Sequence, residues 1–284
     1  MRFLAALLMW VLSTTALTVA VPTTWAQHTI VDPDGYADFA ASAGRDPKLQ
    51  EAMASLLTTQ IVSFAAKNGY GNLNPELVRS VTTSYTQNAG FPGQFAQANR
   101  IVHTWMFTDS IPHDQGSDDR WLIDVAPMLR DSSIQATLGN LNLQVPETLT
   151  VPIAVPDNSS LRPGQLRQFA KWGPWVSISA MVLTGVLALL TLAAARSRGK
   201  TLAALGVSAL AVGAAGWAGI EVAQRYVDRA LDQTTGDIRD VAQAMVGHAE
   251  GSLHQWLNLT LAAGGALVVF GVVVSMFGGL RKRD

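Results

Sequence analysis

The chain has 284 residues, with 20 lysine and arginine residues against 21 acidic ones, and it has no cysteine. A net charge of −1 excludes a strongly basic nucleic-acid binder, and the lack of cysteine excludes disulfides, thiolate metal sites and a cysteine nucleophile. Only 14% of the residues are charged, against roughly 25% in soluble domains. The deficit is local, because several long stretches carry no charge at all.

Four such stretches, residues 3–21, 175–195, 201–220 and 257–280, are long enough to cross a bilayer. A hydrocarbon core of about 30 Å needs about 20 apolar residues in a helix. The predicted fold class is therefore mainly α: four transmembrane helices with a mostly helical extracytoplasmic domain that contains a short β element. The predicted parts are a signal-anchor over 1–26, an extracytoplasmic domain over 27–172, spans over 173–195, 201–221 and 257–280, a cytoplasmic turn over 196–200, an extracytoplasmic hairpin over 222–256 and a basic tail over 281–284.

The first apolar stretch has two interpretations. Arg2, the apolar run and Thr24-Trp25-Ala26 could form a signal peptide cleaved after Ala26. Thr24 fits the small-residue cleavage pattern poorly, and the run is longer than the apolar part of a usual signal peptide. We favour a retained anchor. In both cases the chain from residue 27 onward is exported.

The orientation follows from the basic residues, which stay on the cytoplasmic side. With four spans, both termini and the 196–200 turn share that side, whereas residues 23–172 hold 14 acidic and 10 basic residues. We therefore expect a multi-pass plasma-membrane protein with cytoplasmic termini and its main domain outside. The residues that fix this topology are Arg196, Arg198, Lys200, Arg281, Lys282 and Arg283.

Tryptophan supports the same orientation, because indole rings prefer the membrane–water boundary. Five of the eight tryptophans fall at the predicted outer ends of spans, and the inner ends have Arg and Lys instead. The predicted membrane-interface residues are Trp25, Trp172, Trp175, Trp217 and Trp256.

Start signals predict several helices in the extracytoplasmic domain. Asp32-Pro33, Asp46-Pro47 and Asn74-Pro75 each place a capping side chain before a proline, and a further helix is expected over 92–107. A strand is expected from Trp121, and prolines limit residues 141–155 to a short edge pair or an extended connection. A helix over 160–171 is expected to run into the second span, with Gly173-Pro174 as a possible kink.

The 222–256 segment is predicted to form an amphipathic helical hairpin that turns at residues 234–236. Such a hairpin needs a surface to pack against. The sequence leaves two candidates for this surface, the first outer domain and another subunit.

No set of residues predicts catalysis or a cofactor, and the chain is expected not to be an enzyme. The most metal-like cluster is His113, Asp114, Asp118 and Asp119, which we interpret as a solvated turn, with a weak divalent-cation site as the alternative. His103 and Asn99 share a helix face and could form a hydrogen-bonded pair, although a structurally satisfied histidine is the commoner outcome.

Glycines in the last two spans predict close helix packing, because small residues let backbones approach in lipid. A pore lining is the alternative, but no span carries a charge inside it. The predicted helix-packing residues are Gly213, Gly216, Gly219, Gly264, Gly271 and Gly278.

Five short segments carry a resemblance to known proteins: residues 31–36 (VDPDGY), 46–52 (DPKLQEA), 95–100 (FAQANR) with His103, 124–127 (DVAP) and 151–155 (VPIAV). With these segments in this order, the chain resembles a family of actinobacterial uncharacterised integral membrane proteins with an N-terminal anchor, a helical outer domain and three further spans. It implies this topology and a retained anchor, and it implies no activity or ligand. The polar insertion over 113–120 departs from it.

These observations favour a non-enzymatic scaffold or accessory subunit in cell-envelope biogenesis or export. Its expected partners are the lipid bilayer and either a membrane or envelope protein or a second copy of itself. A lipid- or solute-transport subunit is the first alternative, and an envelope hydrolase or transferase the second. The last would bring His103, Asn99 and a carboxylate into one cleft.

Overall fold

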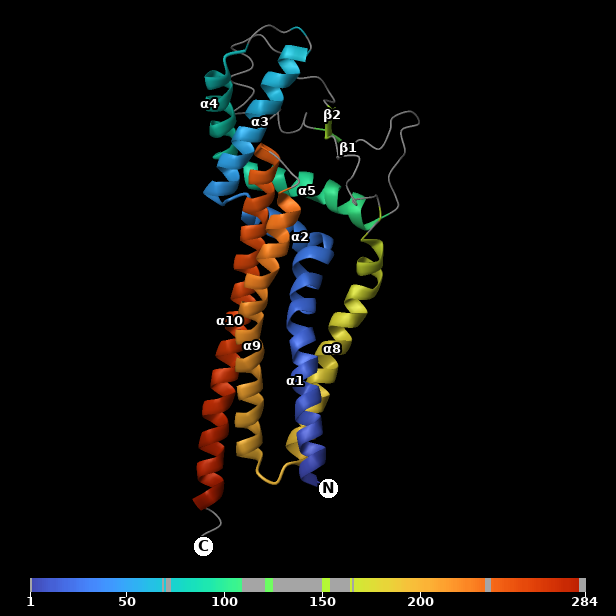
Figure 1. Ribbon diagram of the computed structural model, residues 1–284, viewed down its shortest axis with the longest axis vertical. Helices are drawn as coiled ribbons and strands as arrows, with labels where there is room; N and C mark the ends of the chain where they lie inside the picture. Colours follow the sequence, from blue (N-terminus) through green and yellow to red (C-terminus); the bar gives the residue numbers. More distant parts are fainter. Residues whose placement is uncertain are drawn as a thin grey trace. The chain divides into compact units, whose positions relative to one another are not determined.

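The computed structural model describes residues 2–67, 69, 73–108, 121–124, 150–153, 164, 166–232 and 236–280. Helices dominate these residues, so the mainly α prediction is confirmed (Figure 1). The chain divides into two compact units. One comprises residues 1–28, 171–229 and 249–284 and is called the span unit here; the other comprises residues 29–170 and 230–248 and is called the α2–α5 unit.

Four helices are long and apolar enough to cross a membrane. α1 covers Arg2–Ala26 and continues into the π-helical turn η1, Gln27–Val31; α8 covers Arg167–Ala194, α9 Arg198–Leu231 and α10 Asp237–Leu280. The apolar stretches run over Leu4–Val31, Arg167–Ala194, Arg198–Leu231 and Asp237–Phe277. Four helices with the length and composition predicted for membrane spans are therefore present in the described part of the chain.

α9 and α10 are longer than a bilayer requires. They have 34 and 44 residues, against about 20 for a span. α9 ends at Leu231 and α10 begins at Asp237, and Gly236 between them has a φ of 66°, which favours glycine. The predicted hairpin 222–256 is divided between the units, because residues 230–248 belong to the α2–α5 unit.

Helix start signals placed the remaining helices well. α2 covers Pro33–Ala43, α3 Pro47–Lys67, α4 Pro75–Thr86 and α5 Phe91–Phe107. The Asp32 side chain accepts a hydrogen bond from the Gly35 amide at 2.8 Å, and the Asn74 side chain accepts one from the Glu76 amide at 2.9 Å. These caps satisfy amides that the first turn of a helix leaves unpaired.

The core of the α2–α5 unit is built from alanines and aromatic rings. Its buried residues are Ala37, Ala40, Ala43, Leu49, Met53, Tyr85, Phe91, Phe95 and Ala96. Val241, Ala244 and Met245 of α10 pack against this core. The α10 arm of the predicted hairpin therefore packs on the chain's own α2–α5 unit, which was one of the two partners left open.

Two four-residue strands, β1 (Trp121–Asp124) and β2 (Thr150–Ile153), form an antiparallel ladder in which Trp121 lies opposite Ile153. No other strand occurs in the described residues. The described part of the chain is accordingly mainly α.

Candidate functional site

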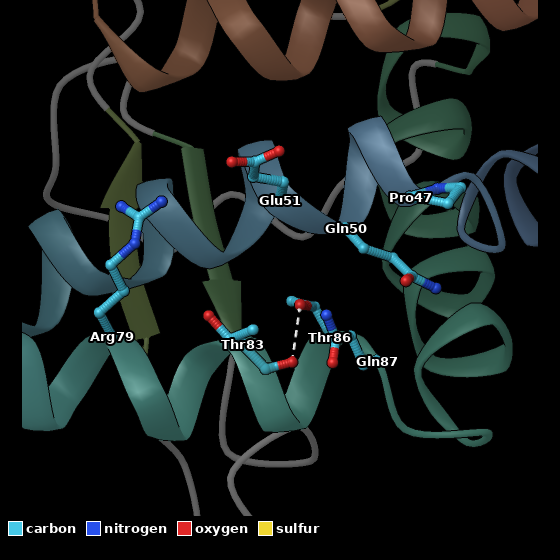
Figure 2. A pocket seen from close by; sticks show the side chains of 7 residues that line it. All are labelled: Pro47, Gln50, Glu51, Arg79, Thr83, Thr86 and Gln87. Atoms are coloured by element: carbon cyan, nitrogen blue, oxygen red, sulfur yellow. Dashed lines mark hydrogen bonds between the residues drawn. The ribbon is translucent and has the colours of Figure 1, made fainter.

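A polar groove lies between α3 and α4. Its volume is about 370 Å³, and Figure 2 shows the side chains that line it, which come from α3, from α4 and from the residue that follows α4. The lining residues are Pro47, Gln50, Glu51, Arg79, Thr83, Thr86 and Gln87. Pro47, Gln50 and Glu51 appear in the sequence only as parts of a helix start and of the resemblance, and none of the seven residues was predicted to bind a partner, because apolar periodicity marks the other faces of these helices.

Hydrogen bonds between α3 and α4 hold the groove walls in register. The hydroxyls of Thr58 and Thr82 are 2.8 Å apart and both are buried. Nearer the groove, Arg79 Nη1 donates to Ser55 Oγ at 3.3 Å. Because Glu51 lies one helical turn before Ser55, it lies one turn from Arg79 along the groove.

The groove holds one carboxylate and one guanidinium that are not paired with each other. Among the described residues, ion pairs join Arg100 to Asp34 and Arg239 to Asp232. Both groove charges are on exposed residues, so both can bind a group from outside the chain. An arrangement of one acid, one base and several amides and hydroxyls suits recognition of a polar surface.

His103 is buried and forms hydrogen bonds with backbone carbonyls of η1. Its side chain is 3% exposed, and its Nε2 lies 3.1 Å from the carbonyl oxygens of both Ile30 and Val31. In a π-helix these carbonyls would accept from the amides of residues 35 and 36. Those amides instead donate to Asp32, at its carboxylate and its carbonyl, so His103 supplies the donor that the turn lacks.

Aromatic rings enclose this histidine. Phe107 stacks on the imidazole with ring centroids 4.3 Å apart, and the Tyr36 ring lies at 5.1 Å. Burial lowers the pKa of His103 from its ordinary value of 6.5, against the opposing effects of the two carbonyl bonds and the Asp32 charge. The nitrogen that would act in catalysis is already engaged, which favours a structural role.

Asn99 bonds to Tyr36 instead of His103. The Tyr36 hydroxyl donates to Asn99 Oδ1 at 3.2 Å, and Asn99 Nδ2 donates to the Phe95 carbonyl at 2.9 Å. Burial raises the pKa of Tyr36 above its ordinary value of 10. The predicted helix face is therefore correct, but the two side chains form no hydrogen bond with each other.

The five tryptophans lie at one end of the span unit. Ser13 Oγ donates to the Thr184 carbonyl at 3.3 Å, which sets the register of the antiparallel helices α1 and α8. Trp25 lies 12 residues after Ser13 and Trp172 lies 12 residues before Thr184, so both rings are at the same level. Each is about 18 Å from that contact. We call this the tryptophan end.

α9 and α10 bring the remaining rings to the same end. Trp25 Nε1 donates to Ser252 Oγ at 3.1 Å, and the Trp256 ring lies 6.4 Å from that of His28. Trp217 Nε1 donates to Asn258 Oδ1 at 3.2 Å. Trp172 and Trp175 are exposed, at 57% and 69%.

The basic turn lies at the opposite end. Trp10 Nε1 donates to the Ala204 carbonyl at 3.2 Å, and Thr14 Oγ1 donates to Ser208 Oγ at 2.9 Å, so α1 and α9 run parallel with a fixed register. In this register the 196–200 segment is level with the first residues of α1. It contains Arg196, Arg198 and Lys200.

Glycines bring α9 and α10 into backbone contact. A Cβ on Gly206 would lie 2.7 Å from the Gly264 carbonyl oxygen, and one on Gly271 would lie 2.7 Å from the Gly199 carbonyl oxygen. Gly213 and Gly216 face leucine side chains, at Leu261 and Leu257. The contact at Gly206 agrees with the packing expected of the glycines in this span, whereas Gly199, which precedes the predicted span, was not anticipated.

Gly219 does not take part in this packing. A Cβ there would meet nothing within 4 Å, so Gly219 is not in contact with α10. The small-residue spacing that suggested it lies on an exposed side of α9. Gly278 is in α10, and its side-chain surroundings are outside the described part of the chain.

Several predicted residues lie outside the described part of the chain. They are His113, Asp114, Asp118, Asp119, Arg281, Lys282 and Arg283. Within the residues that are described, no group of three or more His, Asp or Glu side chains could hold a metal ion.

Comparisons of the chain with family models, with curated proteins and with solved structures find no match.

Proposed function

We propose that the chain is a multi-pass plasma-membrane protein that acts as a non-enzymatic scaffold or accessory subunit in cell-envelope biogenesis or export. The α3–α4 groove is its binding surface for a polar segment of a partner protein. The observation that supports this is an open groove in which Glu51 and Arg79 are not ion-paired with each other and whose walls are joined by interhelical hydrogen bonds, one of them from Arg79 to Ser55. A preorganised charged groove lowers the entropic cost of binding.

The proposal places both termini in the cytoplasm and the α2–α5 unit outside. It is supported by the separation of the basic 196–200 turn from the tryptophan end of the span unit, because basic residues stay cytoplasmic. The retained anchor and the resemblance to the actinobacterial membrane proteins are part of this proposal.

The orientation can be tested with single cysteines, because the chain has none of its own. Ser197→Cys lies in the basic turn, and Gln97→Cys lies on an exposed position of α5. A membrane-impermeant maleimide should label Gln97→Cys in intact cells and Ser197→Cys only after permeabilisation. The reverse labelling pattern would show that the chain has the opposite orientation in the membrane.

The groove can be tested by charge reversal with a matched control. Arg79→Glu changes the charge inside the groove, and Lys48→Glu makes the same change on an exposed residue of α3 outside it. After in-cell crosslinking at native expression, partner recovery should fall about tenfold for Arg79→Glu, as loss of one charge-assisted contact predicts, and stay unchanged for Lys48→Glu. Equal recovery with both variants, or recovery of the chain alone, would contradict the proposal.

A further inference from the structure

Two buried polar atoms in α1 and η1 have no hydrogen-bond partner: Thr24 Oγ1 and Gln27 Oε1. Thr24 is only 6% exposed. A buried polar atom without a partner destabilises the folded state, and such atoms are rare in folded proteins. Other hydroxyls of α1 avoid this cost, as Thr15, Thr18 and Thr23 donate to carbonyls of their own helix. A hydrogen-bond partner for Thr24 Oγ1 and for Gln27 Oε1 therefore has to come from outside the chain.

Helical spacing places both orphan atoms, Thr24 Oγ1 in α1 and Gln27 Oε1 at the start of η1, on the side that meets α8. Ser13, Ala20, Thr24 and Gln27 share this face by helical spacing, and Ser13 bonds to the Thr184 carbonyl of α8. α1 and α8 lie side by side in Figure 1. In their antiparallel register, Thr24 is level with residue 173, one turn beyond the buried Ala20 and Ser177.

Prolines weaken both helices at this level. Pro22 lies inside α1 and Pro174 inside α8, and the register puts them within about one residue of the same level. Each proline removes one helical N–H donor, which lowers the cost of bending the helix there. Near the two orphan atoms, α1 and α8 can therefore bend apart at a lower cost in free energy than elsewhere along this helix pair.

The surroundings match the head-group region of a bilayer. Trp25, Trp172 and Trp175 lie at this end, and about 33 Å of helix separates it from the other end of α1. Lys171 lies beside them, with its Nζ 5.8 Å from the Trp172 ring centroid, and the residue is exposed. A lysine at this depth can bind a lipid phosphate.

We propose that the tryptophan end of α1 and α8 binds a phospholipid whose head group carries a hydrogen-bond donor. Lys171 binds the phosphate, and the donor of the head group, such as the ammonium of phosphatidylethanolamine, bonds to Gln27 Oε1 and Thr24 Oγ1. The proposal rests on these helices crossing a bilayer, and it does not depend on the partner of the α3–α4 groove or on which side of the membrane this end faces.

The test uses nanodiscs that contain equal amounts of phosphatidylethanolamine and phosphatidylcholine, whose choline group has no N–H donor. Native mass spectrometry of the full chain should show ethanolamine lipid retained over choline lipid by about 3- to 10-fold, the ratio expected from one net hydrogen bond or slightly more. The double variant Thr24→Val, Gln27→Met should lose this preference. The control Thr15→Val, Gln97→Met changes the same residue types at exposed positions and should keep it.

Lys171→Gln separates the two contacts. It should lower the amount of both lipids retained and leave their ratio unchanged, because the phosphate is common to them. The proposal is overturned if the wild-type chain shows no preference, or if the Thr24 and Gln27 double variant keeps it. Unchanged lipid binding with a higher unfolding temperature in the double variant would identify the two orphan atoms as a packing cost alone. Gln27→Met by itself serves as the test if the double variant does not fold.

Discussion

His103 Nε2 lies 3.1 Å from the carbonyl oxygen of Ile30 and equally close to that of Val31. Carbonyl oxygens only accept, so Nε2 carries the hydrogen and donates to both, which fixes the tautomer of the ring when the histidine is neutral. The bond joins α5 to the π-helical turn that leads into α2. A side chain that first suggested catalysis therefore completes the backbone hydrogen bonding of an irregular turn.

The first prediction concerns the loss of this donor. His103→Phe keeps an aromatic ring next to Phe107 and removes the N–H, so the two partly buried carbonyls of Ile30 and Val31 lose their partner. The free energy of unfolding should fall by about 1–3 kcal/mol. His103→Gln keeps an N–H donor and should cost less. Denaturation of the detergent-solubilised protein, followed by tryptophan fluorescence, measures both, and a His103→Phe variant as stable as the wild type would contradict this role.

The second prediction is a loss of stability in mild acid. Because burial lowers the pKa of His103 in the folded state, the unfolded chain takes up this proton first as the pH falls below 6.5. The contribution of His103 to stability is complete above that pH and declines toward the folded pKa, with a slope of at most about 1.4 kcal/mol per pH unit. The wild type should therefore lose more stability than His103→Gln between pH 7.5 and 5. Parallel curves for the two proteins would rule out this titration.

The third prediction tests the contact between α9 and α10. A Cβ on Gly206 or Gly264 would lie under 3.0 Å from backbone atoms of the other helix. Gly206→Ala and Gly264→Ala should each destabilise the protein by about 1–3 kcal/mol, because the helices must move apart. Gly219→Ala and Gly265→Ala are matched controls, since their added methyl groups meet nothing within 4 Å. Unfolding temperatures in detergent should fall for the first pair only.

Local signals in the sequence were sufficient for the helix starts. A capping side chain before proline located α2, α3 and α4 to the residue, because the cap and the fixed φ of proline act within one turn. The apolar stretches located the spans for a similar reason, since length and hydropathy are properties of one segment.

The candidate site depends on which residues of different helices lie opposite one another. Such pairings are harder to predict from the sequence than helix starts. The α3–α4 groove requires knowing that Arg79 lies opposite Ser55, which no single-helix pattern states. The seven-residue glycine spacing of α10 was visible, but its match to Gly199 and Gly206 depends on the register of two antiparallel helices. The role of His103 was hidden because it depends on the π-turn, whose sequence gives no recognisable signal.

The last prediction concerns the bond that holds the groove walls together. The Thr58 and Thr82 hydroxyls are 2.8 Å apart, and each also reaches a carbonyl of its own helix, at Ala54 and Arg79. Removing one hydroxyl leaves the other satisfied by its own helix, so Thr58→Val and Thr82→Val should each cost only about 0.5–1.5 kcal/mol. Once one hydroxyl is gone the bond between the helices is already lost, so the double variant should cost less than the sum of the single ones. A double-mutant cycle from urea or thermal unfolding measures this coupling. Strict additivity would show that the hydroxyl pair does not join α3 to α4, and that other contacts keep the groove in shape.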